Sequence, residues 1–153
     1  MEAAENPYTV QQELQQTMND LVGIIRRADE MEQALKKLDE LCRRAEQVVV
    51  EGHRSFNPGW HLALDLRNML VVSECVAKAA LERTESRGGH TRDDFPAMDA
   101  GWRRVLLACT PGTDGIEVAR KDQIPMRADL LELFERDELA KYLTDAELPE
   151  GAA

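Results

Sequence analysis

The chain has 153 residues, of which 43% are hydrophobic, 31% charged and 5% aromatic, and its net charge is −10. This length and apolar content predict a single soluble globular domain whose core is large enough to fold without metals or disulfides. No hydrophobic run approaches the roughly 20 residues that a membrane-spanning helix needs, and residues 1–6 lack the basic and apolar regions of a signal peptide. Direct membrane insertion and secretion are therefore not expected.

The acidic side chains are concentrated at the C-terminal end of the chain. Residues 126–153 contain three basic and eight acidic residues, which accounts for half of the net charge. Because an acidic surface repels phosphate groups, neither nucleic acid nor an anionic membrane is expected as the main partner.

Cysteine and histidine residues show no spacing typical of a metal site. Cys42, Cys75 and Cys109 are odd in number and contain no C-x-x-C motif, so we expect buried small apolar residues in a reducing compartment. A metal or iron–sulfur site and a single reactive thiol are the less favoured alternatives. His53 and His61 are separated by a predicted helix break and fit no standard ligand spacing, which indicates structural histidines.

The first predicted helix begins at Pro7, with Asn6 as its cap. Apolar residues at steps of three and four extend the pattern to residue 25: Val10, Leu14, Met18, Leu21, Val22 and Ile25. Gly23 lies within this range, where it marks either close approach of a neighbouring helix or a weak point.

A second helix is predicted from about Asp29. Its apolar seam is spaced as in a coiled coil, and Glu32–Lys36 and Asp39–Arg43 are favourable charge pairs on the solvent side. The seam consists of Met31, Leu35, Leu38, Cys42, Ala45 and Val49. Since it runs under three heptads, an antiparallel hairpin inside a helix bundle is favoured over a free-standing coiled coil.

A third helix is predicted to begin at Asn57 and Pro58 and to end at Gly88 and Gly89. One stripe carries Leu62, Leu66, Met69, Ser73, Val76 and Ala80, and further apolar residues lie on other sides: Leu64, Leu70, Val71, Val72 and Leu81. A helix that is apolar over most of its circumference is expected to be central in the fold.

After the third helix, residues 102–110 and 115–120 flank a turn-rich stretch at 111–114, which predicts a short β-hairpin. Residues 129–143 form an acidic amphipathic segment. This segment is expected to cover the bundle as a solvated helical arm, with a partner-binding peptide as the alternative.

One loop carries a high density of polar groups. Residues 85–96 read Glu-Ser-Arg-Gly-Gly-His-Thr-Arg-Asp-Asp-Phe-Pro. Such residues can satisfy one another in an ion-pair network, dock onto another domain, or act as acid and base. The residues alone favour the network, then docking, then catalysis, because no nucleophile or cofactor pocket accompanies them. The common nucleotide-binding and hydrolase motifs are also missing from the sequence.

Several segments resemble, in order, the C-terminal helical domain of succinate dehydrogenase and fumarate reductase flavoprotein subunits, an architecture that L-aspartate oxidase shares. They are residues 57–70, 79–83 and 85–96. Residues 21–26 look like the first helix of that domain, and Trp102 with the hairpin looks like its terminal strands. The resemblance covers about residues 7–120, and the Ser-Arg-Gly-x-His-x-Arg-x-Asp-x-Pro string from Ser86 is its most specific part.

The resemblance implies a parent protein that interconverts succinate and fumarate with FAD and passes electrons through an iron–sulfur subunit to a membrane quinone site. The flavin-binding and substrate-binding residues of the family lie in earlier domains. We therefore expect this chain alone to bind no FAD and to contain no catalytic, cofactor-binding or metal-binding residues. By resemblance it packs against the flavin-binding domain of the parent subunit, in a complex with the iron–sulfur subunit and membrane anchor at the cytoplasmic face of the membrane. Interdomain docking is assigned to Arg87, Gly88, Gly89, His90, Arg92 and Asp93.

The combined expectation is a mainly α fold. Residues 1–125 form an antiparallel three-helix bundle with a small β-hairpin, and residues 126–153 form the acidic tail. The expected function is a structural and docking domain. Its rivals are an independent helical adaptor that binds a protein partner through the acidic tail, and a small hydrolase or lyase that uses Arg87, His90 and Asp93. If Arg87 serves docking, its replacement by Ala should change the stability of the isolated domain little, since exposed ion pairs contribute about 0 to 1 kcal/mol.

Overall fold

The computed structural model describes residues 4–113, 115–143, 145 and 148. Internal packing divides the chain into two units, Met1–Lys121 and Asp122–Ala153. In the described residues, the long helices, strands and 3-10 helix up to residue 122 are, in chain order, α1 (Pro7–Leu21), β1 (Ile25–Arg26), α2 (Ala28–Ala45), α3 (Pro58–Glu82), β2 (Thr91–Arg92), the 3-10 helix Ala100–Trp102, β3 (Val105–Gly112) and β4 (Gly115–Asp122), whose last residue lies across the boundary. The prediction of a mainly α fold with a small β-hairpin is confirmed.

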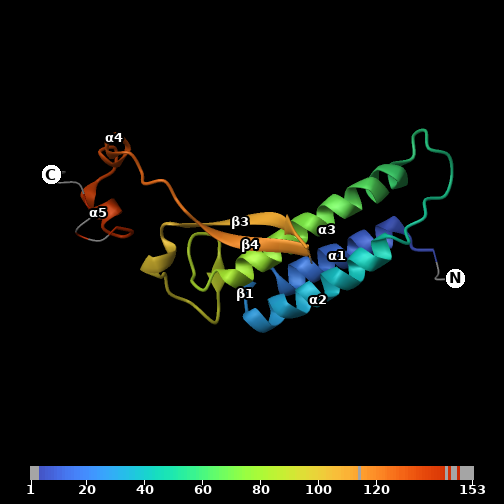
Figure 1. Cartoon of the computed structure of the whole chain (residues 1–153), viewed down its shortest axis with the longest axis horizontal. Coiled ribbons are helices and arrows are strands. Elements are labelled where there is room, and N and C mark those ends of the chain that lie inside the picture. Colours follow the sequence, from blue (N-terminus) through green and yellow to red (C-terminus); the bar gives the residue numbers. More distant parts are fainter. Residues whose placement is uncertain (1–3, 114, 144, 146–147, 149–153) are drawn as a thin grey trace. The chain divides into compact units, whose positions relative to one another are not determined.

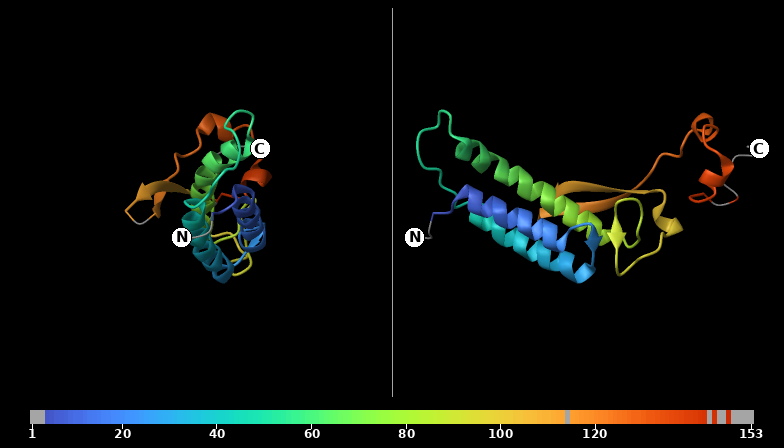
Figure 2. Two further views of the ribbon diagram at one scale, coloured as in Figure 1. Left: turned by 90° about the vertical axis from the view of Figure 1, so that its right-hand side faces the viewer. Right: turned by 180° about the vertical axis from the view of Figure 1, so that it is seen from behind.

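The three long helices lie side by side, with α2 running opposite to α1 and α3 (Figure 1). Strand β1 pairs in parallel with β2, and β3 pairs with β4 in a separate two-stranded sheet. The view from behind in Figure 2 shows β1 and the loop after α3 at the end of the helices where α2 begins. This end of the helices contains the polar loop singled out from the sequence.

One hydrophobic core joins the three helices. Each contributes a stripe of buried residues spaced by three, four, seven or eight positions, as expected for amphipathic helices that share a core. The cluster contains Val10, Leu14 and Val22 from α1 and the residue after it, Ala34, Leu38 and Leu41 from α2, and Leu66, Leu70 and Ala77 from α3.

Helix α1 begins as predicted, because the Asn6 side chain accepts a hydrogen bond from the Tyr8 amide at 2.9 Å. It ends at Leu21, so the predicted continuation to Ile25 is wrong. A side chain at Gly23 would place its Cβ 2.7 Å from the carbonyl oxygen of Asn19, which explains the glycine just after the helix. Ile25 instead belongs to β1 and is 67% exposed.

Helix α3 also begins as predicted, since the Asn57 side chain accepts from the Gly59 amide at 3.0 Å. It contacts α1, α2 and β3, but a set of its apolar side chains is exposed, contrary to the expectation that burial would extend around the helix. These are Leu64 (59% exposed), Val71 (45%), Val72 (61%) and Val76 (41%). Two neighbouring helices and a hairpin leave one side of a helix open, so these residues form an uncovered face, called the α3 apolar face below.

The predicted β-hairpin is present, although β3 continues through Pro111 and Gly112, which were expected in the turn. The hairpin lies along α3 (Figure 1). The Arg120 guanidinium lies 4.2 Å from the Trp102 ring centroid and pairs with Glu82 near the end of α3. Since a lone hairpin is marginally stable, these contacts with the helical unit help to hold it in place.

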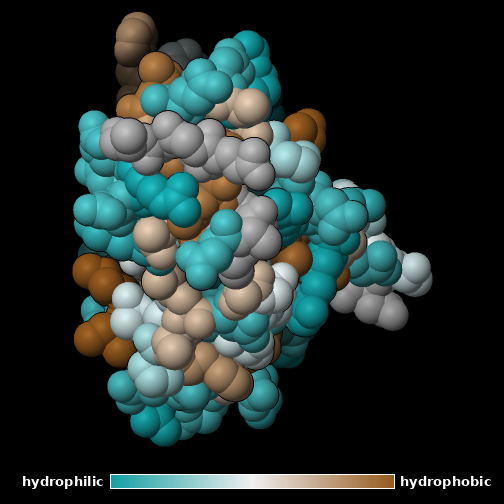
Figure 3. Space-filling view, turned by 90° about the vertical axis from the view of Figure 1, so that its left-hand side faces the viewer, coloured by the Kyte–Doolittle hydropathy of each residue, from teal (hydrophilic) through white to brown (hydrophobic). Residues whose placement is uncertain are grey.

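Among its described residues, the second unit contains two one-turn helices, α4 (Ala128–Leu131) and α5 (Arg136–Leu139). The predicted amphipathic segment at 129–143 is therefore interrupted, because Glu135 has an extended backbone. Glutamates at positions 132, 135 and 138 follow one another at steps of three, and such like charges repel on one helix face. On the face drawn in Figure 3, hydrophilic residues dominate the described part, and hydrophobic residues gather in small groups.

Candidate functional site

The polar loop leaves α3 at Glu82 and makes a tight turn before β2. The main chains of Arg87 and His90 exchange two hydrogen bonds, at 2.8 and 3.0 Å, and Gly88 occupies the left-handed region at φ +58°. The prediction that Gly88 and Gly89 end the helix is wrong, because α3 ends five residues before this turn. The glycine is still needed, since few other residues adopt a positive φ without strain.

Arg92 occupies the C-terminal end of α3. Its side chain is 1% exposed, and its Nη1 donates to the carbonyl oxygens of Ala80, Leu81 and Arg83 at 3.0 to 3.1 Å. The last carbonyls of a helix have no partner within the helix, and the end of the helix dipole favours a positive charge. A side chain from β2 therefore supplies the C-terminal cap of α3.

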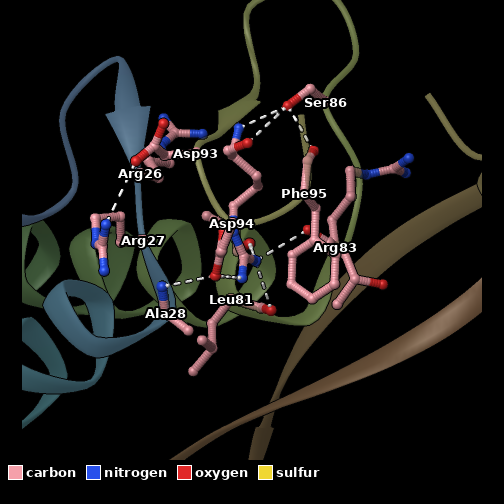
Figure 4. Close-up of polar contacts among 12 residues, drawn as sticks. Arg26, Arg27, Ala28, Leu81, Arg83, Ser86, Asp93, Asp94 and Phe95 are labelled. Atoms are coloured by element: carbon pink, nitrogen blue, oxygen red, sulfur yellow. Dashed lines mark hydrogen bonds and ion pairs between the residues drawn. The ribbon is translucent and has the colours of Figure 1, made fainter. Parts of the chain in front are cut away.

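Asp94 connects this cap to the start of α2. Its carboxylate accepts from Nε and Nη2 of Arg92, both at 2.7 Å, and from the Ala28 amide at 3.1 Å. Figure 4 shows Asp94 lying between Ala28 and Leu81. The hydrogen bonds from Arg92 are the main reason that the pKa of Asp94 is lowered from 3.8 to about 2. We call this pair the Arg92–Asp94 clasp, because it joins the end of α3 to the beginning of α2.

Glu85 is a fully buried carboxylate next to the clasp. It accepts from Arg83 at 2.6 Å, from Arg87 at 2.9 Å through both of its oxygens, and from the Asp99 amide at 2.9 Å. Burial alone raises the pKa of Glu85, but these hydrogen bonds outweigh it and lower the pKa from 4.5 to about 2. Glu85 is thus ionised and fully engaged, and Arg87 is its partner on one side.

His90 lies between two arginines. Its Nδ1 is 2.8 Å from Nη1 of Arg26, and its Nε2 is 3.1 Å from the carbonyl oxygen of Arg83. Because a guanidinium only donates, Nδ1 is the acceptor and Nε2 carries the proton. Burial lowers the pKa of His90, and the positive charge of Arg26 lowers it further, so the ring is neutral.

Only part of the loop faces solvent. Gly88 and Gly89 have open space around them, and Asp93 pairs at 3.4 Å with Arg27 while both side chains remain more than half exposed. Figure 4 shows Arg27 and Asp93 on the side of the loop next to β1. The six residues assigned to docking therefore divide into buried or half-buried side chains with internal partners and an exposed set, Gly88, Gly89 and Asp93.

This arrangement favours a structural role for the polar loop over a catalytic one. Arg87 is bound to Glu85, His90 to Arg26 and Arg83, and Asp93 to Arg27, so the three residues of the hydrolase or lyase alternative share no partner. In the described part of the chain, every buried side-chain nitrogen and oxygen has a hydrogen-bond partner. The loop behaves as an internal network that holds helix ends together.

Among the described residues, no group of three or more His, Cys, Asp or Glu side chains is placed to hold a metal ion. The three cysteines are free and only half-buried, whereas full burial was expected. No helix in the described ranges is both long enough and apolar enough to cross a membrane.

Comparison with known proteins identifies the helical domain. Residues 11–137 match the family model described as the C-terminal part of the fumarate reductase flavoprotein. The chain belongs to this family. It is 35% identical over 115 residues to the fumarate reductase flavoprotein subunit of Helicobacter pylori, covering 74% of this chain and 16% of that protein. It is 37% identical over 100 residues to the succinate dehydrogenase flavoprotein subunit of Coxiella burnetii, covering 64% and 17%.

The solved Sdh1 complex of Mycobacterium smegmatis contains a chain of similar fold, with a TM-score of 0.87 and 61% identity. The match covers 97% of this flavoprotein C-terminal domain and 26% of the Sdh1 chain. This domain therefore spans less than a fifth of the curated relatives named above and about a quarter of the solved chain. The resemblance noted from the sequence is confirmed at the level of the family.

Sequence reasoning missed four members of the network in this family domain: Arg26, Arg83, Glu85 and Asp94. Each lies on or beside a segment that the sequence analysis had quoted, but none was given a role. A signal was available, since α2 begins after Arg27, which makes no side-chain cap, and α3 ends without a basic residue in its last turn. Helix ends that lack local caps indicate that distant side chains supply them.

Proposed function

We propose that this chain is the C-terminal structural and docking domain of an FAD-dependent flavoprotein subunit that interconverts succinate and fumarate. Its helices act as an antiparallel three-helix bundle that supports the flavin-binding domain. By this proposal the domain spans residues 1–125, and the acidic segment from residue 126 is an appendage. The chain alone has no catalytic role.

The observation that carries this proposal is the α3 apolar face. Soluble monomers rarely expose several neighbouring apolar side chains on one helix unless another surface covers them. Leu64, Val71 and Val72 lie on this face, and the matched relatives are four to six times longer than the segment they share with this chain. A covering domain in the parent subunit accounts for both facts.

The polar loop has two roles in this proposal. Arg87, His90 and Arg92 hold the loop in shape through their internal partners, while Gly88, Gly89 and Asp93 meet the neighbouring domain. Support comes from the open space at the two glycines and from the exposure of Asp93. Close approach of another backbone is easiest where there are no side chains.

Names of the relatives support the parent reaction and partners. They include fumarate reductase and succinate dehydrogenase flavoprotein subunits, and Sdh1 of Mycobacterium smegmatis has been solved in complex with UQ1. We extend to this chain a parent complex in which FAD delivers electrons through an iron–sulfur subunit to a quinone at a membrane anchor. The domain lies on the cytoplasmic side, at the inner face of the membrane.

Binding to the rest of a homologous subunit tests the proposal. The 153-residue chain is mixed with the portion of the Mycobacterium smegmatis Sdh1 chain that it does not match, and association is followed by size-exclusion chromatography and flavin absorbance. We expect co-elution, and we expect the chain alone to take up neither FAD nor succinate. Val72→Asp and Asp93→Lys should weaken association without lowering stability, whereas Gln33→Asp on the exposed side of α2 should change neither.

Two results contradict the docking role. One is the absence of co-elution with the wild-type chain, and the other is unchanged association of the Val72→Asp variant. If the chain purified alone is yellow and contains stoichiometric flavin, the expectation that it binds no FAD by itself is contradicted.

An independent helical adaptor is the second candidate, and exposed apolar residues in the acidic unit favour it. Leu133 is 77% exposed and Tyr142 is 59% exposed, among acidic neighbours. A peptide of residues 122–153 should then bind a partner with the same affinity as the whole chain. If removal of these residues leaves association with the Sdh1 portion intact, the acidic unit is not the binding surface and the adaptor function is contradicted.

A further inference from the structure

Two of the three cysteines meet where the hairpin lies on α3. Cys75 is on α3 and Cys109 is on β3, and the Cys109 thiol donates to the main-chain oxygen of Cys75 at 3.7 Å. Both thiols are free and half-buried, so small reagents can reach them. One sulfur thus rests against the other cysteine residue, although 33 residues separate the two in sequence.

Contacts on either side of the two cysteines fix the position of the hairpin along α3. The Ile116 amide donates to Glu74 at 3.1 Å, and Lys78 Nζ donates to the Ile116 carbonyl oxygen at 2.8 Å. Glu74 and Lys78 also pair with each other at 2.7 Å, one turn apart on α3 and on either side of Cys75. The hairpin therefore cannot slide along the helix without breaking these bonds, which keeps the two cysteines together.

We propose that Cys75 and Cys109 form a reversible disulfide that fastens the hairpin to α3. Strand β3 packs against α3, and the Cys109 sulfur already reaches the main chain of Cys75, which is the proximity that a disulfide needs. This modification site is independent of the docking role proposed above.

The oxidant is a low-molecular-weight disulfide such as oxidised glutathione. One cysteine thiolate attacks a sulfur of this disulfide, forms a mixed disulfide and releases one small thiol. The second cysteine thiolate then attacks the protein sulfur of the mixed disulfide, and a second small thiol leaves. The two protein thiols lose two protons and two electrons, and the small disulfide is reduced to two thiols.

Cys75 is not an activated nucleophile. Burial raises the pKa of Cys75, and the adjacent Cys109 raises it further. Burial also raises the pKa of Cys42 on α2, which makes Cys42 a matched competitor of similar reactivity. Selectivity for the Cys75–Cys109 bond must therefore come from proximity.

Thiol counting and peptide mapping test the proposal on the full 153-residue chain. After incubation with oxidised glutathione at mildly alkaline pH, we expect loss of two of the three thiols and a mass lower by two hydrogens. The dominant crosslinked tryptic product should join the peptide that contains Cys75 to the one that contains Cys109. Main-chain amides of the hairpin should exchange hydrogen more slowly after oxidation, and dithiothreitol should reverse both effects.

Variants separate the three thiols. Cys42→Ser should leave the crosslink unchanged, whereas Cys109→Ser or Cys75→Ala should abolish it. The proposal is overturned if the crosslink involves Cys42, or if Cys75 and Cys109 end as separate glutathione adducts. The proposal is also overturned if all three thiols of the folded chain remain free after incubation with oxidised glutathione.

Discussion

Removing the guanidinium of Arg92 should destabilise the helical unit strongly. In Arg92→Met, a side chain of similar length keeps the apolar volume but loses every donor. The carbonyl oxygens of Ala80 and Leu81 then lose Arg92, that of Arg83 is left with His90 alone, and Asp94 loses both of its hydrogen bonds from Arg92. Deleting one partner of a fully buried ion pair costs roughly 3 to 5 kcal/mol, and because the Asp94 side chain is 28% exposed we expect a loss near the lower end of this range.

The pKa of Asp94 gives a second magnitude for the same hydrogen bonds. Its pKa is lowered from 3.8 to about 2, with hydrogen bonds from Arg92 as the largest cause. Because Asp94 is partly exposed and its charge is screened by solvent, this displacement corresponds to at most about 2 kcal/mol of stabilisation of the ionised form at neutral pH. The loss of the helix cap adds to this value, so the two estimates agree on a loss of several kcal/mol.

Urea unfolding of the full chain, followed by the helical circular dichroism signal, measures this loss. Arg27→Ala is the matched control, since Arg27 also pairs with an aspartate of the same loop, but both side chains are more than half exposed. The control should lose at most about 1 kcal/mol. Equal stability of the Arg92→Met and Arg27→Ala proteins would refute the structural role of the clasp.

Three further results are expected. Arg87→Ala should lower the unfolding free energy by about 2 to 4 kcal/mol, because it removes a partner of buried Glu85. This replaces the small effect expected for a residue that serves docking alone. A loss no larger than that of an exposed ion pair would contradict the Arg87–Glu85 pairing. Stability should fall as pH is lowered, first below about 6.5, where His90 becomes protonated on unfolding, and then from about 5 towards 2, where Glu85 does so. Folding lowers the pKa of both His90 and Glu85, so each group stabilises the folded state at pH values above its pKa in the unfolded chain. A stability maximum below pH 5, measured by urea unfolding over a pH series, would be inconsistent with this. Leu66→Asp should cost several kcal/mol, because Leu66 is 1% exposed, whereas Leu64→Asp on the 59% exposed position should leave the melting temperature nearly unchanged.

Local chemistry was sufficient to predict several features of this domain. The Asn-Pro pairs at residues 6–7 and 57–58 begin α1 and α3, because a capping side chain and a fixed proline φ act within one turn of the chain. The periodic stripes identified the three helices, although not the uncovered face of α3, and the family could be recognised from residues 57–96. In each case the determining interactions lie within a few residues, so they are visible in the sequence.

Local patterns failed where distant segments compete for the same residues. The apolar spacing continued to Ile25, but the backbone of residues 25–26 pairs with residues 91–92, and that pairing removes them from the helix. Leu64 fits an apolar pattern equally well, and only the number of elements packed around α3 decides that it is exposed.

The polar loop shows most directly what tertiary structure decides. Its sequence offers charged residues that are compatible with a network, with docking or with catalysis, since a list of residues does not say which groups meet. Folding brings the start of α2, the end of α3 and residues 92–94 together, so that Arg92 finds three carbonyls and Asp94 finds an amide. Burial then makes each hydrogen bond costly to break, because an unpaired polar group has no water to replace its partner. The charges come from the sequence, but their pairing and their energetic weight depend on which groups folding brings together: Arg92 meets carbonyl oxygens 9 to 12 positions away, and Asp94 meets the Ala28 amide 66 positions away.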